Sequence, residues 1–214
     1  MRLFNYWRSS ASWRVRFALA YKGVPYEYVA VSLLKDGGEQ RAEAYRAMNP
    51  MAQVPTLEWV EGGETMRLGQ SLAIIEYVDA AFPGPSLLPA QPFVRAKVRQ
   101  LAEIVNAGIQ PLQNLEVLRY VREDLHADTA AWARHFVGHG VRALEAEAVH
   151  TASAYLVGDQ VTLADCCLVP QLYACRRFGV DLSACPTLLR VEAALQRLAA
   201  YAASHPDAQP DAQP

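Results

Sequence analysis

Hydrophobic and polar residues follow different patterns in the two halves of the chain. Over the first 81 residues, short strand-like apolar runs alternate with stretches of helical periodicity. The strand-like runs are Leu3–Tyr6, Tyr26–Val31, Val54–Val60 and Glu64–Leu68, and the helical stretches lie near Ser12–Lys22, Glu39–Met48 and Gln70–Ala81. This βαβαββα order predicts a small mixed sheet covered by helices.

Residues 82–92 break this pattern. Four prolines and one glycine within eleven residues cannot continue a helix, so we predict a linker here. Beyond it the periodicity is helical, over Val94–Gly108, Pro111–Leu125, Asp128–Val149, Thr162–Phe178 and Thr187–Ala203. We therefore predict two domains, an α/β domain over residues 1–81 and an all-α domain over residues 93–214. The polar, proline-rich tail 205–214 is either wrapped on the surface or disordered.

Composition and charge exclude several classes of protein. Of 214 residues, 52% are hydrophobic and 20% are charged, and the net charge of −2 gives no sign of nucleic-acid or membrane binding. No apolar run is long enough to span a membrane and the N-terminus has no signal-peptide core, so we expect a cytoplasmic location. The four cysteines, Cys166, Cys167, Cys175 and Cys185, form no C-x-x-C pair, so we expect buried thiols and no metal site.

A serine-rich turn joins the first predicted strand to the first helix. It contains Ser9, Ser10 and Ser12, and Arg14 and Arg16 follow. The first N–H groups of a helix are unpaired and its dipole favours negative charge, so a thiolate carried by a ligand would be stabilised there. A hydroxyl can donate to the thiolate, and the arginines raise the local positive potential. The alternative is that Ser10 or Ser12 simply caps the helix.

Two further segments can bind a peptide-like ligand. Pro55 begins a predicted strand, and a cis Val54–Pro55 bond would let the main chain of Val54 pair with an extended peptide, whereas a trans proline would be an ordinary strand start. Gln70 and Ser71 begin a helix, where an amide and a hydroxyl either bind a carboxylate or form a simple cap.

The second half contains two motifs with clear physical interpretations. Thr162-Leu-Ala-Asp165 fits a capping box, which we interpret as structural. Arg176 and Arg177 end a predicted helix, where they either complement its dipole or bind a dicarboxylate. The five histidines do not cluster with acids or serines, so a Ser-His-Asp site has no support.

Seven motifs, in order along nearly the whole chain, resemble those of the zeta class of cytosolic glutathione S-transferases. They are Ser9–Arg16, Asn49–Leu57, Gln70–Tyr77, Gln110–Asn114, Leu163–Asp165, Leu168–Gln171 and Arg177–Leu182. The resemblance implies a thioredoxin-like N-terminal domain, an all-helical C-terminal domain, a cis Pro55, glutathione as cofactor and a homodimer. One departure is Ala11, because zeta enzymes often have a cysteine after the second serine.

The same resemblance implies roles for individual residues. Ser10 would bond the glutathione sulfur with Ser9 beside it, and Arg14 would help to stabilise charge on the substrate. Arg177, or Arg176 in its place, would bind a substrate carboxylate. The remaining residues implied to bind glutathione are Gln40, Val54, Pro55, Gln70, Ser71, Gln110 and Asn114.

The implied reaction is the cis–trans isomerisation of maleylacetoacetate to fumarylacetoacetate in tyrosine and phenylalanine catabolism, by reversible addition of the thiolate to the alkene. The alternatives are a maleylpyruvate isomerase, a transferase or dehalogenase acting on α-halo acids, and a non-catalytic binding module. Because Gln110 and Asn114 are neutral, they favour maleylacetoacetate over the more compact, doubly acidic maleylpyruvate. The presence of Ser9, Ser10, Gln70 and Ser71 argues against a binding module.

Overall fold

The computed structural model describes residues 1–213 and divides into two compact units. The first unit contains residues 1–86 and 198–213, and the second contains residues 87–197. The sequence pattern places the last segment with the helical domain, whereas in the structure it packs on the first helix of the N-terminal unit. There the indole N–H of Trp13 donates to the hydroxyl of Ser204 at 3.0 Å.

The first unit contains a four-stranded sheet in the order β2-β1-β3-β4. Its elements are β1 (Arg2–Asn5), α1 (Ser10–Lys22), β2 (Glu27–Ala30), η1 (Lys35–Gly37), η2 (Glu39–Arg41), α2 (Glu43–Met48), β3 (Thr56–Glu61), β4 (Glu64–Gly69), α3 (Ser71–Ala81), α9 (Ala199–Ser204) and η5 (Pro206–Ala208). Strands β1 and β2 are parallel, and β3 is antiparallel to both β1 and β4. The expected βαβαββα order is confirmed.

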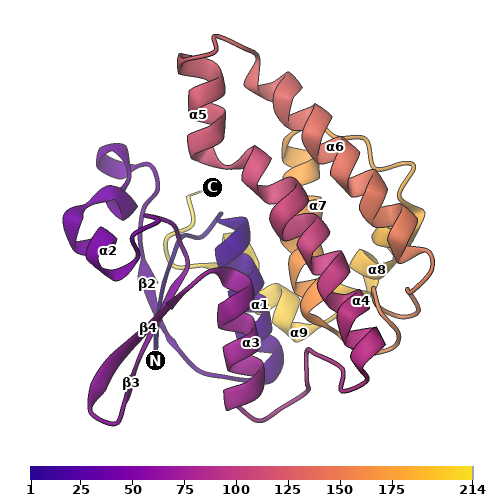
Figure 1. Cartoon of the computed structure of the whole chain (residues 1–214), viewed down its shortest axis with the longest axis horizontal. Coiled ribbons are helices and arrows are strands. Elements are labelled where there is room, and N and C mark those ends of the chain that lie inside the picture. Colours follow the sequence, from indigo (N-terminus) through magenta and orange to yellow (C-terminus); the bar gives the residue numbers. More distant parts are fainter. Residues whose placement is uncertain (214) are drawn as a thin grey trace. The chain divides into compact units, whose positions relative to one another are not determined.

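Helices cover both faces of this sheet. Figure 1 shows α1 and α3 on one side and α2 on the other. The core contains Leu3, Phe17, Leu57 and Ile74, each with no exposed surface. Burial of such side chains supplies most of the favourable free energy of folding.

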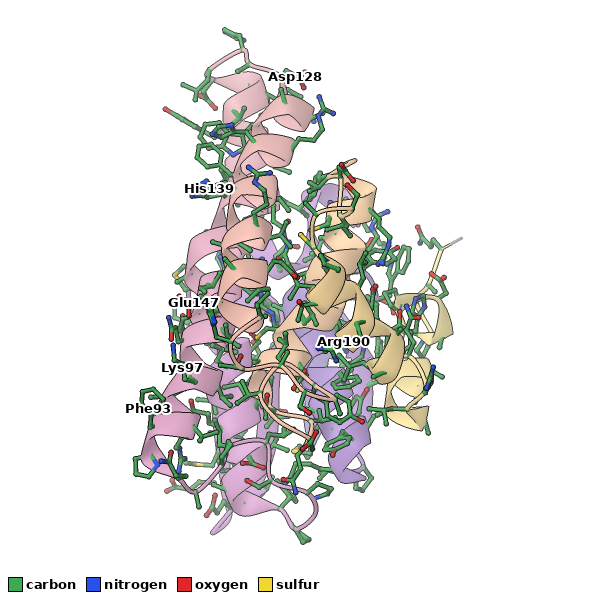
Figure 2. The ribbon with its side chains drawn as sticks, turned by 90° about the vertical axis from the view of Figure 1, so that its right-hand side faces the viewer. Phe93, Lys97, Asp128, His139, Glu147 and Arg190 are labelled. Carbon is green, nitrogen blue, oxygen red and sulfur yellow. The ribbon has the colours of Figure 1, made fainter. Side chains whose placement is uncertain are left out.

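The second unit is a helical bundle. Its elements are α4 (Pro92–Glu103), η3 (Ile104–Ile109), η4 (Gln110–Gln113), α5 (Leu115–Glu123), α6 (Thr129–Ala148), α7 (Leu163–Arg177) and α8 (Pro186–Leu195). Figure 2 labels Lys97 of α4 and Glu147 of α6, whose ion pair of 3.4 Å joins these helices. The four cysteines are buried thiols that form no disulfide within residues 1–213, as predicted.

The helical pattern of the second half is interrupted at two places in the structure. The expected break near Gly108 and Pro111 is confirmed, because a π-helical turn (η3) and a 3-10 turn (η4) separate α4 from α5. The single helix predicted over Thr187–Ala203 is wrong, since Leu198 is extended (φ −79°, ψ 137°) and separates α8 from α9. No glycine or proline marks this break, which lies where the chain passes from the second unit to the first.

Within the described residues, no helix is both long and apolar enough to cross a membrane.

Candidate active site

One row of strand pairing brings three loops to the same end of the sheet. Phe4 pairs with Thr56, and Thr56 pairs with Gly69. Strand β1 leads from this row into α1, β4 leads from it into α3, and β3 is entered from Val54–Pro55. The start of α1, the start of α3 and the Val54–Pro55 segment are therefore neighbours, although they are distant in sequence.

The serine-rich turn at the start of α1 has an open N-terminus. Ser9 is the N-cap, because its hydroxyl accepts the N–H of Ser12 at 3.2 Å. The alternative that Ser10 or Ser12 forms this cap is therefore wrong; Ser12 is buried, and its oxygen accepts the N–H of Tyr6 at 3.5 Å. Ser10 is half-buried, and no described residue bonds its hydroxyl, its N–H or the N–H of Ala11. One hydroxyl and two N–H groups are thus available to an anionic ligand.

The two arginines of the motif are buried within the first unit. Arg14 is 1% exposed, and its Nη1 donates to the hydroxyl of Ser71 at 3.2 Å. Arg16 has no exposed surface and donates to Asn5 and to main-chain carbonyl oxygens. Their contacts join α1 to neighbouring segments. That Arg14 contacts substrate stays a prediction, and the contact that the structure shows for its Nη1 is with the Ser71 hydroxyl.

Arg8 is a cation of this turn that the sequence analysis missed. It is half-buried, directly precedes Ser9, and its guanidinium carbon lies 5.2 Å from the centre of the Trp7 ring. The signal that could have found it is its position in the loop before the helix, where side chains face ligands more often than on the helix itself.

The loop before β3 offers hydrogen-bonding groups to an extended ligand. The Val54–Pro55 bond is cis, as the resemblance implies. Neither the N–H nor the C=O of Val54 is hydrogen-bonded to any residue among 1–213. Gln40 is 7% exposed, and its Oε1 has no partner in the described chain. Because a buried, unsatisfied amide oxygen is costly, these groups fit the main chain of a bound peptide such as glutathione.

The start of α3 is also open. Gln70 is exposed, has a positive φ of 66° and forms no side-chain cap. The first main-chain bond into the helix runs from the N–H of Ile74 to the oxygen of Gln70. Ser71 is buried and accepts the bond from Arg14. A simple side-chain cap is therefore absent here. The main-chain N–H groups before Ile74 and the positive end of the helix dipole are suited to binding a carboxylate.

The second unit holds the other predicted residues on two joined segments. Gln110 begins η4, and the side-chain oxygen of Asn114 caps α5 by accepting the N–H of Glu116 at 2.9 Å. The buried Gln113 bonds Gln171 of α7 at 3.3 Å. This contact connects the η4 segment to the helix that ends with the two arginines.

These two arginines have different surroundings. Arg176 forms a two-pronged ion pair with the buried carboxylate of Glu192. Arg177 is exposed, and its guanidinium carbon lies 4.7 Å from the centre of the Phe178 ring. A carboxylate of this protein therefore already occupies the fork of Arg176, which leaves this side chain fewer donors for a substrate carboxylate.

Known proteins match both units of this chain. A family model described as "Glutathione S-transferase, N-terminal domain" matches residues 3–86, and "Glutathione S-transferase, C-terminal domain" matches residues 118–201. The maleylacetoacetate isomerase of Rattus norvegicus is 47% identical over 209 residues, which cover 98% of this chain and 94% of that protein. The probable maleylacetoacetate isomerase 2 of Drosophila melanogaster is 46% identical over 212 residues, covering 99% and 90%.

Solved structures of maleylacetoacetate and maleylpyruvate isomerases are also similar to this chain. Maleylacetoacetate isomerase from Anaeromyxobacter dehalogenans 2CP-1, with bound GSH in the active site, has a TM-score of 0.91 and 52% identity, covering 99% of this chain and 97% of that one. A holo maleyl pyruvate isomerase, a bacterial zeta-class enzyme, has a TM-score of 0.92 and 43% identity with complete coverage (100%) of both chains. The thioredoxin-like and helical parts expected from the sequence are thereby confirmed.

Because such identity extends over nearly the whole chain, the protein belongs to the maleylacetoacetate isomerase family of zeta-class glutathione S-transferases.

Proposed function

We propose that this protein is a glutathione-dependent cis–trans isomerase that converts maleylacetoacetate to fumarylacetoacetate. The observation that carries the proposal is the open start of α1, where the Ser10 hydroxyl and two N–H groups have no acceptor or donor among the described residues. The relatives at 46% and 47% identity that bear this name support the choice of substrate.

Bound glutathione would supply a thiolate that adds reversibly to the alkene carbon, so that the double bond becomes single, rotates and re-forms when the thiolate leaves. The Ser10 hydroxyl would donate a hydrogen bond to the thiolate sulfur, and the N–H groups at the start of α1 would stabilise the negative charge of that sulfur. Gln40 and the main chain of Val54 next to Pro55 would hold the peptide. Ser9 would act as the N-cap that shapes this turn.

At the start of α3, Gln70 and Ser71 would bind the γ-glutamyl carboxylate, with Arg14 behind Ser71 to fix its hydroxyl. Gln110 and Asn114 of the second unit are proposed to complete the set of glutathione-binding residues. Arg177 is the proposed cation for a substrate carboxylate, with Arg176 as the alternative. Arg8 would supply positive charge near the substrate oxygen on which negative charge develops.

The test is a direct assay with two substrates and a measurement of free glutathione. We expect a larger kcat/KM for maleylacetoacetate than for maleylpyruvate, with the glutathione concentration unchanged after complete conversion. A larger kcat/KM for maleylpyruvate would instead identify the shorter keto acid as the substrate. Stoichiometric consumption of glutathione would identify a transferase.

Maleylpyruvate isomerase is the second candidate, since a zeta-class protein of that name is 43% identical to this chain. It is disfavoured because Gln110 and Asn114 bring no positive charge for a compact, doubly acidic substrate.

We also propose a cytoplasmic homodimer. A particle mass of twice the chain's 23.6 kDa in solution would support this assembly. A single species with the monomer mass would contradict it. Recovery of the protein in the soluble cytoplasmic fraction of its cell tests the location.

A further inference from the structure

The C-terminal segment, residues 198–213, contacts the turn that carries Ser10. Asp211 makes this contact: its Oδ2 accepts a hydrogen bond from the main-chain N–H of Trp7 at 3.1 Å, and its Oδ1 accepts one from the hydroxyl of Tyr28. Trp7 lies three residues before Ser10, and Tyr28 belongs to β2. A carboxylate more than 200 positions away in sequence therefore joins the turn to the edge of the sheet.

Arg16 binds the other main-chain polar group of Trp7. Its Nη2 donates to the carbonyl oxygen of Trp7 at 2.7 Å, and its Nη1 donates to that of Tyr6 at 3.2 Å. Its Nε donates to the carbonyl oxygen of Ser204, also at 3.2 Å. The N–H and the C=O of Trp7 are thus both held, one by Asp211 and the other by a buried guanidinium that also binds the C-terminal segment.

The residue after Asp211 continues this contact by apolar packing. Ala212 packs against a buried cluster made of Phe4, Tyr6, Trp7, Val31, Tyr45 and Val54. That cluster includes residues of the turn and the residue whose main chain is available to a peptide. Burial and the hydrogen bond to Asp211 raise the pKa of Tyr28, so its hydroxyl stays protonated and remains a donor at neutral pH.

We propose that Asp211 is a positioning residue that fixes the Ser10 turn for thiolate stabilisation. The inference rests on the proposed function, in which glutathione's sulfur binds at Ser10. A hydrogen bond to sulfur depends on distance and angle, and the open N–H groups at the start of α1 are aimed by the same turn. Release of Trp7 would allow this turn to move, and a small misplacement of a catalytic group lowers the rate strongly.

Two variants separate hydrogen bonding from charge. Asp211→Ala removes both acceptors. Asp211→Asn removes the negative charge, but its oxygen can still accept from Trp7 and its amide can donate to the oxygen of Tyr28. If Asp211 acted only as a nearby negative charge, both variants would lower the pKa of a bound thiol, because the thiolate would lose a repulsive neighbour.

The first measurement is amide hydrogen exchange in the protein without glutathione. We expect faster exchange at the N–H of Trp7 in Asp211→Ala than in the wild type, and little change in Asp211→Asn. Asp207→Ala is the matched control, since Asp207 is the equivalent residue of the preceding Asp-Ala-Gln-Pro repeat and is exposed, pairing with His205 at 3.6 Å. Unchanged Trp7 exchange in Asp211→Ala would overturn the inference.

The second measurement is the pKa of the thiol of bound glutathione, followed by the ultraviolet absorbance of the thiolate. We expect a rise of about one pKa unit in Asp211→Ala, hence about a tenfold loss of kcat below the new pKa. Asp211→Asn and Asp207→Ala should stay near the wild-type value. A fall of the pKa in both Asp211 variants would overturn the positioning role.

A milder variant covers the case in which Asp211→Ala does not fold. Tyr28→Phe removes one of the two bonds of Asp211 and should shift both readouts in the same direction by a smaller amount. No change in either readout would count against the inference. Absence of a thiolate signal in the wild type would overturn the proposed function. A wild-type signal that persists unchanged in Asp211→Ala would overturn the inference alone.

Discussion

The helices α1 and α7 both begin after a hydroxyl-bearing N-cap residue, but their first turns differ in hydrogen bonding and burial. Helix α7 follows Thr162, whose N–H and hydroxyl both donate to Oδ2 of Asp165 at 2.8 Å. Oδ1 of the same carboxylate accepts the N–H of Leu156 at 2.9 Å, and the whole group is buried. Helix α1 follows Ser9, has no acidic residue in its first turn and leaves Ser10 half-buried.

Two positions account for much of the difference. Three residues after the N-cap, α7 has Asp165 and α1 has Ser12. The carboxylate of Asp165 reaches back to Thr162 and closes the helix start. The shorter side chain of Ser12 instead accepts a bond from Tyr6 in the loop before the helix. The other position is the first residue of each helix. The N–H of Leu163 donates to the carbonyl oxygen of Leu87 at 2.9 Å, whereas the N–H of Ser10 has no partner among the described residues and is left for a ligand.

The largest expected effect is on the closed helix start. Asp165→Ala should lower the free energy of unfolding by about 3 to 5 kcal/mol, because three buried donors lose their acceptor at once. Urea denaturation measures this loss. A loss below about 1 kcal/mol would show that the carboxylate is dispensable and would remove the contrast between the two helices.

The next effect is on chemistry at the open helix start. Ser10→Ala should lower kcat/KM at least about tenfold, since it removes the proposed donor to sulfur. Its free energy of unfolding should change by no more than about 0.5 kcal/mol, because no described residue bonds this hydroxyl. Enzyme assays measure kcat/KM, and urea denaturation of the same preparation measures the free energy of unfolding. An unchanged rate would assign thiolate stabilisation to the N–H groups of the helix alone.

Ser9→Ala should affect the free energy of unfolding more than Ser10→Ala does, and kcat/KM less. It removes the N-cap bond of 3.2 Å to Ser12 and should cost about 1 kcal/mol of stability. Its effect on kcat/KM should be smaller than that of Ser10→Ala. If Ser9→Ala impaired kcat/KM more than Ser10→Ala, the assignment of cap and donor to these two serines would be reversed.

The smallest expected effect is the pH dependence of the closed helix start. Burial raises the pKa of Asp165 to about 6, against an ordinary value of 3.8, even though four hydrogen bonds favour the ionised form. Between pH 7 and pH 5 the folded protein takes up a proton here and the unfolded chain does not. The contribution of this group to stability therefore increases by about 1 kcal/mol as the pH falls.

Carbon NMR of the Asp165 carboxyl measures this pKa directly. A midpoint below the ordinary value of 3.8 would mean that hydrogen bonding outweighs burial, and stability would then fall rather than rise on acidification.

Much of the architecture could be predicted from the chain itself. Alternation of strands and helices up to Ala81 followed from residue periodicity, and the capping box at Thr162 followed from local spacing. The cis state of Pro55 could not come from local pattern, since trans is the usual state of such bonds, and it followed from the family resemblance.

The rest depends on contacts between residues distant in sequence. Arg14 and Arg16 look like surface cations in a one-dimensional pattern, but tertiary packing buries both. The break at Leu198 and the contact of Asp211 with Trp7 have no local signal, because each requires the C-terminal segment to fold onto the first unit. Residue roles that depend on such contacts become visible only in three dimensions.

The most direct test of the account is the pKa of the thiol of glutathione bound to the wild type and to Ser10→Ala. The open start of α1 predicts a pKa well below the ordinary thiol value of about 8.5 in the wild type, and a rise of about one unit or more in the variant. Equal pKa values in the two proteins would contradict the assignment of Ser10 as the donor to sulfur.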